Sequence, residues 1–378
     1  MPVKKGYPFI NWMQDANTGM EVVEGCKVDV DHVLRWLRDV SACRVLVQSP
    51  LGLRKTALWL GGRIISEGYE VYLSSSNCWG GCDVAYNEAS GLNVDAIVHL
   101  GHSRFLRKDK IPTIYVECRY SDDSPLRSLA RQLSGVFQGF RVVGLGASVQ
   151  WLDQLNTVID SLQKDGIKVL TAQPEMYSVY EAQVLGCDAT GMKKIENNVD
   201  AYLVVGSVFH GLGVALLTSK TTFAADPHTQ KIVDLTDMRN KILRQRYANI
   251  EAFRKANRVG VLVSVKPGQK RHGLALRINK LLRSHGKQSY LLTSDEITPS
   301  TVLENKFEAF VNTACPRLSI EDQSQFSKPL LLPAESLVAL GLLEWSEVVD
   351  RGLLMYPWGW SDKESSRRFW NRLREVES

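Results

Sequence analysis

The sequence predicts an α/β protein of three successive Rossmann-like domains, each built on a parallel sheet. Short runs rich in β-branched residues alternate with helical stretches, which is the pattern of sheets built from βαβ units. The 378 residues are too many for one ordinary core. Each third of the chain also repeats one order of strand, helix and late turn, and each late turn carries a cysteine among small residues.

The predicted strands have short apolar sequences, and most end in Gly, Ser or another small residue. They are 44–48 (RVLVQ), 96–100 (AIVHL), 141–145 (RVVGL), 168–171 (KVLT), 201–205 (AYLVV), 259–265 (VGVLVSV) and 309–312 (AFVN). Ligands of open parallel sheets gather outside the carboxyl ends of the strands, so the chemistry is expected there.

The domain boundaries are placed near residues 135 and 246, giving predicted domains 1–135, 136–246 and 247–378. A charged stretch at 244–258 predicts a helix that links the last two domains. The last domain ends in an aromatic-rich tail that contains Trp345, Tyr356, Trp358, Trp360 and Trp370. Few basic residues lie between these rings, so we expect them to pack on the third domain and not to stack on nucleic acid.

The composition indicates a globular protein without a membrane span. Hydrophobic residues make up 44% and charged residues 23%, and 46 basic residues nearly balance 41 acidic ones. Direct nucleic-acid binding is therefore not indicated. The first 25 residues lack the apolar core of a secretory signal, and no window reaches about 18 apolar residues, so we expect a cytoplasmic protein.

Seven cysteines, an odd number spread along a long chain, argue against a disulfide framework. The segment WGGCDVA presents Cys82 after two glycines, which let the backbone approach a bulky ligand. A helix expected to begin near Asp83 would favour its thiolate through the helix dipole. The alternative for this cysteine is a turn that ends in a buried, inert side chain.

Two more cysteines have similar surroundings. Cys187 lies in LGCDATG, and Cys315 follows a predicted strand in NTACPRLS. A Cys-Pro pair is common at iron-sulfur ligands. Each motif alone is weak, but together they place three cysteines at what the repeat predicts to be equivalent positions.

The other four cysteines are predicted not to be ligands. Zinc sites more often have their ligands in closely spaced pairs, such as C-x2-C. The one close pair here is Cys78 and Cys82, a C-x3-C, and no further Cys or His lies nearby in the sequence to complete a zinc site. Ala85 stands where a third cysteine of the familiar radical S-adenosylmethionine motif would be. Cys26, Cys43 and Cys118 are interpreted as core or incidental residues.

The chain resembles the archaeal diphthamide synthases, the enzymes of the first step of diphthamide biosynthesis. The resemblance runs from about residue 44 to 335 and rests on these segments in order: WGGCDVAYNEA, DAIVHLGHS, QVLGCDATG, VVGSVFHGLGVAL, ADPHT, VSVKPGQKR, DEITP, FVNTACPRLSIED and KPLLLPAE. It implies three domains arranged around one 4Fe-4S cluster site, with Cys82, Cys187 and Cys315 as the ligands.

The resemblance also implies the reaction. The fourth iron would bind S-adenosylmethionine, whose bond between sulfur and Cγ is cleaved, and the 3-amino-3-carboxypropyl group would pass to a histidine of translation elongation factor 2. A homodimer is expected, and the electron donor stays open. Two positions depart from the family pattern: the family usually lacks a cysteine at Cys78 and commonly has an acidic residue at Ser207.

Residues at other strand ends are candidates for contacting S-adenosylmethionine. His102 and His210 each follow a predicted strand, although a structural hydrogen-bonding role is as common for such histidines. Lys266, Gly268 and Gln269 belong to a basic loop that could meet the methionine carboxylate or be a solvated turn. The glycines of GLGASV form only a partial dinucleotide fingerprint, so a nicotinamide site is disfavoured.

Two other functions stay open. The chain could be a non-catalytic partner subunit that supports the cluster of a second chain, although three cysteine motifs in one chain favour a self-sufficient enzyme. It could also be a structural zinc protein built from α/β units, which metal analysis would distinguish.

Overall fold

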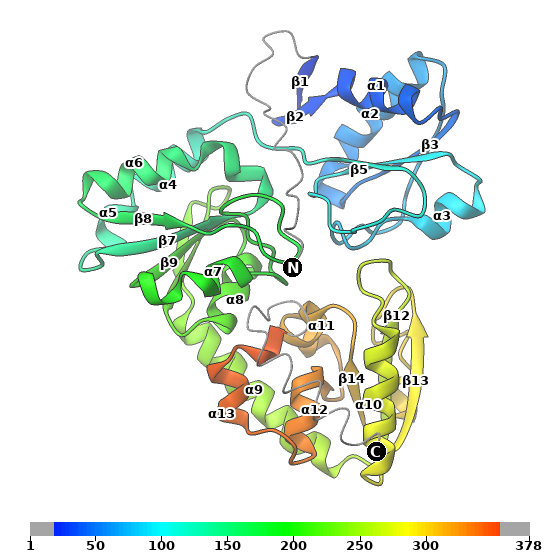
Figure 1. Cartoon of the computed structure of the whole chain (residues 1–378), viewed down its shortest axis with the longest axis vertical. Coiled ribbons are helices and arrows are strands. Elements are labelled where there is room, and N and C mark those ends of the chain that lie inside the picture. Colours follow the sequence, from blue (N-terminus) through cyan, green and yellow to red (C-terminus); the bar gives the residue numbers. More distant parts are fainter. Residues whose placement is uncertain (1–18, 356–378) are drawn as a thin grey trace, which may run out of the picture.

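The computed structural model describes residues 19–355, which form three lobes around a central region (Figure 1). Each lobe contains one sheet, and an antiparallel hairpin of β1 (Met20–Val23) and β2 (Cys26–Asp29) precedes the first. The tail residues 356–378 lie outside the described residues. Trp345 is described, and its ring centroid lies 5.8 Å from that of Tyr247, so this part of the aromatic set packs internally.

The first lobe has a four-stranded parallel sheet in the order β4-β3-β5-β6. Its strands are β3 (Arg44–Gln48), β4 (Glu70–Leu73), β5 (Ala96–Leu100) and β6 (Thr113–Val116). Its helices are α1 (Val30–Asp39), α2 (Arg54–Ser66) and α3 (Tyr86–Gly91). Asp29 caps α1 by accepting the His32 N–H at 2.8 Å. The helix buries Val30, Val33 and Leu37, which recur at helical spacing on one face.

The second lobe has five strands in the order β11-β10-β9-β7-β8, and only β11 is antiparallel to its neighbour. The strands are β7 (Val142–Ala147), β8 (Lys168–Thr171), β9 (Ala201–Val205), β10 (Thr221–Asp226) and β11 (Lys231–Asp234). The helices are α4 (Ser124–Ala130), α5 (Leu133–Val136), α6 (Asn156–Lys164), α7 (Thr190–Lys194) and α8 (Val208–Leu217).

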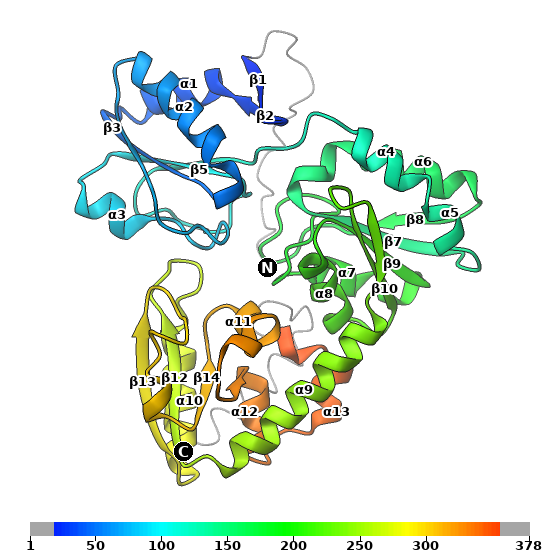
Figure 2. The same ribbon diagram turned by 180° about the vertical axis from the view of Figure 1, so that it is seen from behind.

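The third lobe has a parallel sheet in the order β13-β12-β14-β15. Its strands are β12 (Arg258–Ser264), β13 (Gln288–Ser294), β14 (Ala309–Asn312) and β15 (Leu330–Leu331). Its helices are α10 (His272–Ser284), α11 (Pro316–Ile320), α12 (Pro333–Ala339) and α13 (Trp345–Asp350). The long helix α9 (Thr236–Lys255) runs from the second lobe to the third (Figure 2).

The three sheets share one topology, which confirms the predicted α/β class. In each, the first strand is central, the second lies at the edge, and the third and fourth follow on the other side. Five of the seven predicted strands have the predicted bounds, and β7 and β12 shift by one or two residues. Helix α9 begins eight residues earlier than predicted, and of its buried residues Ile242 lies in this added part. The domain boundaries themselves stay a prediction.

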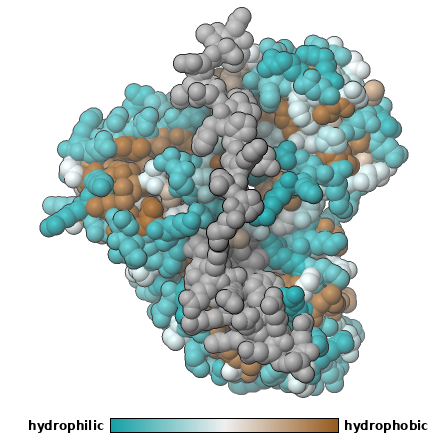
Figure 3. All heavy atoms as spheres, in the orientation of Figure 1, coloured by the Kyte–Doolittle hydropathy of each residue, from teal (hydrophilic) through white to brown (hydrophobic). Residues whose placement is uncertain are grey.

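The lobes are joined in two different ways. One apolar core joins the second and third lobes: Leu212 and Leu216 of α8 belong to the same cluster of buried side chains as Leu274 of α10 and Leu337 of α12. The first lobe is joined to the others mainly by polar contacts, described below. On the face seen in Figure 3 most residues are hydrophilic, and hydrophobic residues gather over the second lobe.

Within residues 19–355, no helix combines the length and the apolar character that a membrane span requires.

Candidate metal centre

The carboxyl ends of the strands in the three lobes face one another. The loop after β12 lies against the Cys82 loop of the first lobe: the Gly268 N–H donates to the Cys82 carbonyl at 2.8 Å, and Gln269 Nε2 lies 3.4 Å from Cys82 Sγ. A Cβ on Gly268 would lie 2.6 Å from the Cα of Cys82, so only glycine permits this approach. The predicted basic loop therefore contacts the predicted ligand directly.

Cys82 lies in a turn and not at a helix N-terminus. The Asp83 N–H donates to the Gly80 carbonyl at 2.9 Å, whereas α3 begins only at Tyr86. The expected helix start near Asp83 is therefore wrong, and the helix dipole does not explain the position of this thiol. The physical reason is Gln48, whose side chain accepts the Ala85 N–H at 3.0 Å and donates to the Asp83 carbonyl at 2.7 Å. These bonds hold the segment extended instead of helical.

Cys187 lies in a loop that a buried carboxylate shapes. The Asp188 side chain accepts the backbone N–H groups of Tyr177, Ser178 and Thr190 at 2.7, 3.1 and 3.1 Å. The backbones of Leu185 and Asp188 exchange hydrogen bonds of 3.0 and 2.8 Å, which close a tight turn around Cys187. The aspartate of the LGCDATG motif therefore has a structural role that its sequence position did not reveal.

Cys315 directly precedes α11, whose first residue is Pro316. Asn312 Nδ2 donates to the Cys315 carbonyl at 2.8 Å and fixes the turn after β14. This lobe departs from the predicted equivalence. Cys82 and Cys187 follow the second strand of their sheets, while Cys315 follows the third strand of its sheet.

The structure brings the three predicted thiols together. Each is half-buried. Burial and, to a lesser extent, the nearby Cys315 raise the pKa of Cys82 to about 12. Burial also raises the pKa of Cys187 well above its usual value, with added contributions from Cys82 and Cys315. Three thiolates here would repel one another, so a bound cation is needed to hold all three deprotonated.

Cationic side chains already favour negative charge at this place. Burial raises the pKa of Cys315, while Arg317 and Arg271 oppose the rise. Arg271 has the same opposing effect on the pKa of Cys187. The three converging thiols fit an iron-sulfur cluster held by three cysteines. The two guanidinium groups and the Gln269 amide, which donates to the Cys82 sulfur, would stabilise the negative charge of the thiolates.

Lys266 makes ion pairs that were not predicted. It is 5% exposed, and its Nζ lies 2.7 Å from Asp83 Oδ2 and 2.6 Å from Glu296 Oε1. Burial lowers the pKa of Lys266, but the two carboxylates more than offset this and raise it overall. Its charge is thus already paired across the first and third lobes, whereas the sequence suggested that it could meet a substrate carboxylate. That contact stays a prediction.

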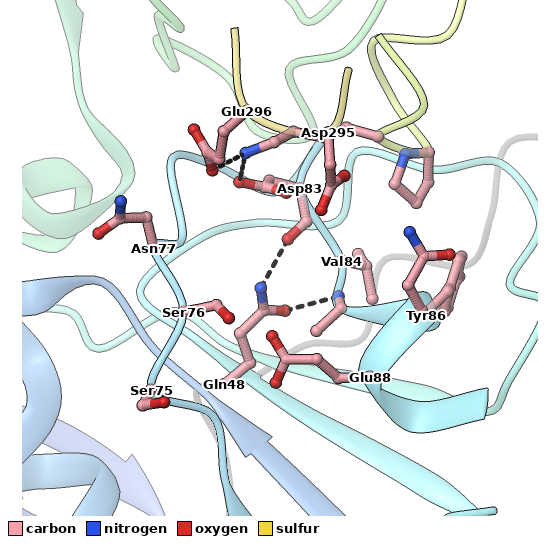
Figure 4. A pocket seen from close by; sticks show the side chains of 14 residues that line it. Gln48, Ser75, Ser76, Asn77, Asp83, Val84, Tyr86, Glu88, Asp295 and Glu296 are labelled. Atoms are coloured by element: carbon pink, nitrogen blue, oxygen red, sulfur yellow. Dashed lines mark hydrogen bonds and ion pairs between the residues drawn. The ribbon is translucent and has the colours of Figure 1, made fainter. Parts of the chain in front are cut away.

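A pocket of about 300 Å³ lies beside this ion-pair group, between the first and third lobes (Figure 4). Gln48, Asp83, Glu88 and Glu296 are among its lining residues, and acidic groups predominate among the charged ones. None of the three predicted ligand cysteines lines it. The pocket therefore flanks the Cys82 loop and is distinct from the place where the thiols converge.

The two predicted histidines lie between the first and second lobes. Burial lowers the pKa of His102 to about 4, and the nearby His210 contributes. Burial likewise lowers the pKa of His210 to about 4, together with Arg317. Both imidazoles are therefore neutral near pH 7. Ser207 Oγ lies 2.9 Å from His210 Nδ1, so the residue that departs from the family pattern orients one of these rings.

A group of three side chains near the thiols, formed by Cys78, His99 and His102, was not predicted from the sequence. Cys78 Sγ lies 3.9 Å from His99 Nε2, which lies 3.0 Å from His102 Nδ1. His99 is part of β5 and 51 residues from Gln48, its hydrogen-bonding partner, so no local motif marks the group. The glycines of the partial dinucleotide pattern, by contrast, lie within β7, where Gly144 and Gly146 leave room for Tyr202 and Val184.

Comparison with known proteins identifies the family. A family model described as diphthamide synthesis protein matches residues 49–349. The chain belongs to the diphthamide synthesis protein family. It is 33% identical over 319 residues to the 2-(3-amino-3-carboxypropyl)histidine synthase of Pyrococcus horikoshii, which covers 84% of this chain and 92% of that protein. It is 28% identical to subunit 1 of that synthase from Gibberella zeae, over 90% of this chain and 73% of that protein.

Solved structures of the family agree with the fold. The crystal structure of Dph2 from Pyrococcus horikoshii with a 4Fe-4S cluster has a TM-score of 0.76 at 32% identity, over 84% of this chain and 91% of that one. Another crystal structure of the same protein has a TM-score of 0.77 and covers 86% and 92%. The predicted family and fold class are confirmed, and so is membership of an enzyme family, since these relatives are named as synthases.

Proposed function

We propose that this member of the diphthamide synthesis protein family transfers the 3-amino-3-carboxypropyl group of S-adenosylmethionine to a histidine of translation elongation factor 2. The observation that supports this is the convergence of one thiol from each lobe at a single place, where Cys315 raises the pKa of Cys82 and both raise the pKa of Cys187. Cys82, Cys187 and Cys315 would hold a 4Fe-4S cluster there and leave one iron without a protein ligand. When bound, the cluster would supply the electron that starts the cleavage of the sulfonium, as in the family that the chain resembles.

Two neutral imidazoles lie near the thiols. S-adenosylmethionine carries a sulfonium charge, and the imidazoles of His102 and His210 add no positive charge to those of Arg271 and Arg317. Either ring can still form a hydrogen bond with the co-substrate or with the incoming histidine. Gly268 and Gln269 contact Cys82 itself, so they would act on the substrate through the position of that ligand.

The choice of the bond to cleave is a matter of orientation. We propose that the site holds the methionine Cγ, not the adenosine carbon, nearest the open iron. A displacement of about 1 Å can change such a rate on the order of a hundredfold. The products should then be methylthioadenosine and a protein substrate heavier by one aminocarboxypropyl group.

Anaerobic reconstitution followed by incubation with S-adenosylmethionine, dithionite and elongation factor 2 tests this function. Mass spectrometry should detect methylthioadenosine and the modified factor. If 5′-deoxyadenosine and methionine predominate, the proposed cleavage is wrong. If methylthioadenosine forms while elongation factor 2 stays unmodified, the chemistry stands but the proposed partner is wrong.

Two features of the proposed enzyme concern its setting. We propose a homodimer, which light scattering of the purified chain would measure directly. We also propose a cytoplasmic location, which is consistent with seven cysteines that are all free. The physiological electron donor stays open, and dithionite replaces it in the assay.

The alternative is a subunit that supports the cluster of a partner chain. Several fungal relatives carry the name subunit 1, which makes a two-subunit enzyme a specific possibility. The purified chain without any partner should modify elongation factor 2 if it is self-sufficient. Activity that requires a second, different chain would favour the subunit function.

A further inference from the structure

A second group of metal-binding atoms lies beside the Cys82 loop. Cys78 Sγ, His99 Nε2 and His102 Nδ1 all lie within 4.8 Å of one another. Cys78 is 6% exposed and His99 is fully buried, whereas His102 is half-buried. The three atoms come from the loop before Cys82, from β5 and from the turn after β5.

Hydrogen bonding determines which nitrogen of His99 carries the proton. The amide of Gln48 is oriented by two backbone groups: its Nε2 donates to the Asp83 carbonyl and its Oε1 accepts the Ala85 N–H. The same Oε1 lies 3.0 Å from His99 Nδ1. An amide oxygen can only accept, so Nδ1 of His99 must donate its proton. In the neutral ring, Nε2 then presents its lone pair toward Cys78 and His102.

This arrangement has the supporting bond typical of metal-ligating histidines. Such a ligand usually donates its other ring N–H to an oxygen acceptor, which fixes the ring and makes it a better ligand. The spacing also suits zinc. With bonds of about 2.0–2.1 Å to nitrogen and 2.3 Å to sulfur in a tetrahedral site, ligand atoms lie roughly 3.4–3.6 Å apart. The observed distances of 3.0 Å between His99 Nε2 and His102 Nδ1 and 3.9 Å between Cys78 Sγ and His99 Nε2 are each within about 0.4 Å of that range. The third pair, Cys78 Sγ and His102 Nδ1, lies within 4.8 Å, so the Cys78 and His102 side chains would have to move closer together around the ion.

We infer that Cys78, His99 and His102 bind a zinc ion, separately from the three-thiol site. Zinc suits one thiolate and two imidazoles, and three protein ligands leave a fourth position for water. The net charge of such a centre would be positive, and the Asp83 carboxylate is nearby, since it accepts the Trp79 N–H within the same loop at 3.2 Å. The inference does not depend on the proposed transferase activity.

The site would anchor the loop that carries Cys82. Residues 78–82 connect the predicted zinc ligand to the predicted cluster ligand, so zinc would tie that loop to β5. Ligation through Nδ1 would leave Nε2 of His102 protonated and able to donate a hydrogen bond. Without a metal, the same three residues would form only a hydrogen-bonded network, and the test below distinguishes these two states.

The experiment measures zinc and iron per chain by mass spectrometry in full-length protein, purified anaerobically from zinc-supplemented cells. The wild-type holoenzyme should contain stoichiometric zinc besides its iron. Cys78→Ser should lower zinc at least tenfold and leave iron unchanged, whereas Cys187→Ser should lower iron and leave zinc unchanged. Cys43→Ser removes an exposed cysteine and is the matched control, which should alter neither metal.

X-ray absorption at the zinc edge of the wild-type holoenzyme shows whether zinc is bound at the Cys78, His99 and His102 group or at the three-thiol site. One sulfur at about 2.3 Å and two nitrogens at about 2.0–2.1 Å support the inference. An all-sulfur shell would mean that zinc occupies the predicted iron-ligand thiols and would overturn it. Zinc in the wild type no higher than in Cys78→Ser would overturn it as well. If Cys78→Ser also loses iron, the metal content of this variant no longer separates the two sites. The zinc-edge spectrum of the wild type then decides which residues bind zinc.

Discussion

The interface between the second and third lobes, here called the apolar joint, differs in chemistry from the interface of the first lobe with the other two, here called the polar joint. Both lie next to the same thiols. The second and third lobes share one apolar core around α8, α9 and α12. The first lobe meets them through polar pairs, among them Lys266 with Asp83, Gln183 Nε2 with Ser103 Oγ at 2.6 Å, and Gln150 Nε2 with the Gly101 carbonyl at 2.7 Å. Stacking of Phe105 on Tyr177, with ring centroids 4.3 Å apart, is an exception.

The difference indicates how the site is assembled. Apolar burial is non-directional and adds up over a large area, so the second and third lobes should behave as one unit. A polar pair adds only about 0.5–1.5 kcal/mol net but requires defined geometry. The first lobe should therefore be positioned precisely and held weakly, and Cys82 lies on that weaker side.

The largest expected effect comes from removing one of the three thiols. Because each thiol comes from a different lobe, the three substitutions test whether the site needs all three lobes held together. Cys82→Ala, Cys187→Ala and Cys315→Ala should each abolish activity and cluster retention, because three ligands have no redundancy. Iron content and product analysis measure the outcome. Cys43→Ala, which removes an exposed thiol, is the control and should keep both. Full activity of Cys187→Ala would refute the ligand assignment.

The apolar joint contains one buried ion pair, and breaking it should cost the most stability. Arg246 on α9 is 1% exposed and Glu335 on α12 fully buried, and Arg246 Nε donates to Glu335 Oε1 at 2.7 Å. Arg246→Ala leaves the carboxylate buried without its partner, which should lower the free energy of unfolding by about 3–5 kcal/mol.

Chemical denaturation measures this loss. Arg254→Ala is the matched control on the same helix. Arg254 is 43% exposed and pairs with Glu251, so its removal should cost about 1 kcal/mol or less. Equal losses for the two variants would contradict the importance given to the buried pair.

The polar joint should respond to Lys266→Met more in cluster retention than in global stability. The substitution leaves Asp83 without its cation beside Cys82, and we expect a loss of about 1–3 kcal/mol. Iron release to a chelator should become faster, because the Cys82 loop is less firmly held. Lys270→Met, four residues later and exposed, is the control. Unchanged iron release would mean that the ion pair does not secure the site.

The smallest expected effect is a pH dependence of the free energy of unfolding, contributed by Asp153, a partly exposed residue of the same joint. Burial raises the pKa of Asp153, but hydrogen bonds from Arg119 and Lys27 more than offset this and lower it. A folded pKa below the unfolded value of about 3.9 adds stability above that pH, and the contribution disappears as pH falls through the folded value.

Partly exposed pairs of this kind contribute roughly 0.2–1 kcal/mol. Denaturation of cluster-free Cys187→Ala protein, with and without Asp153→Asn, should therefore differ slightly in free energy at pH 6, and this difference should shrink as the pH falls below about 4. A difference that persists unchanged at pH 2 would exclude this carboxylate as its source.

The seven strands that the sequence predicted were placed well, because buried parallel strands are short, apolar and locally encoded, whereas β6, β10, β11, β13 and β15 were not predicted. The start of α9 was missed because its first turns are polar and its buried face depends on packing against other helices. The helix start near Asp83 was wrong because Gln48, 35 residues away in the chain, captures the backbone there.

Within the site, glycines and a proline marked the three cysteines, since their effect on the backbone is local. The roles of Lys266, His99 and Asp188 could not be predicted, because each depends on partners that only the fold brings close. The same holds for the Cys78 group, in which β5 supplies a ligand that lies far from Cys78 in the sequence.

The contribution of one thiol by each lobe has a consequence for synthesis on the ribosome. Cys82 is translated 315 − 82 = 233 residues before Cys315. At about 5–20 residues per second, that interval is roughly 10–50 s. During this time the first two thiols have no third partner, so iron delivered early would meet an incomplete site. Metal loading should therefore follow translation, and a nascent chain halted before Cys315 should bind no stable cluster.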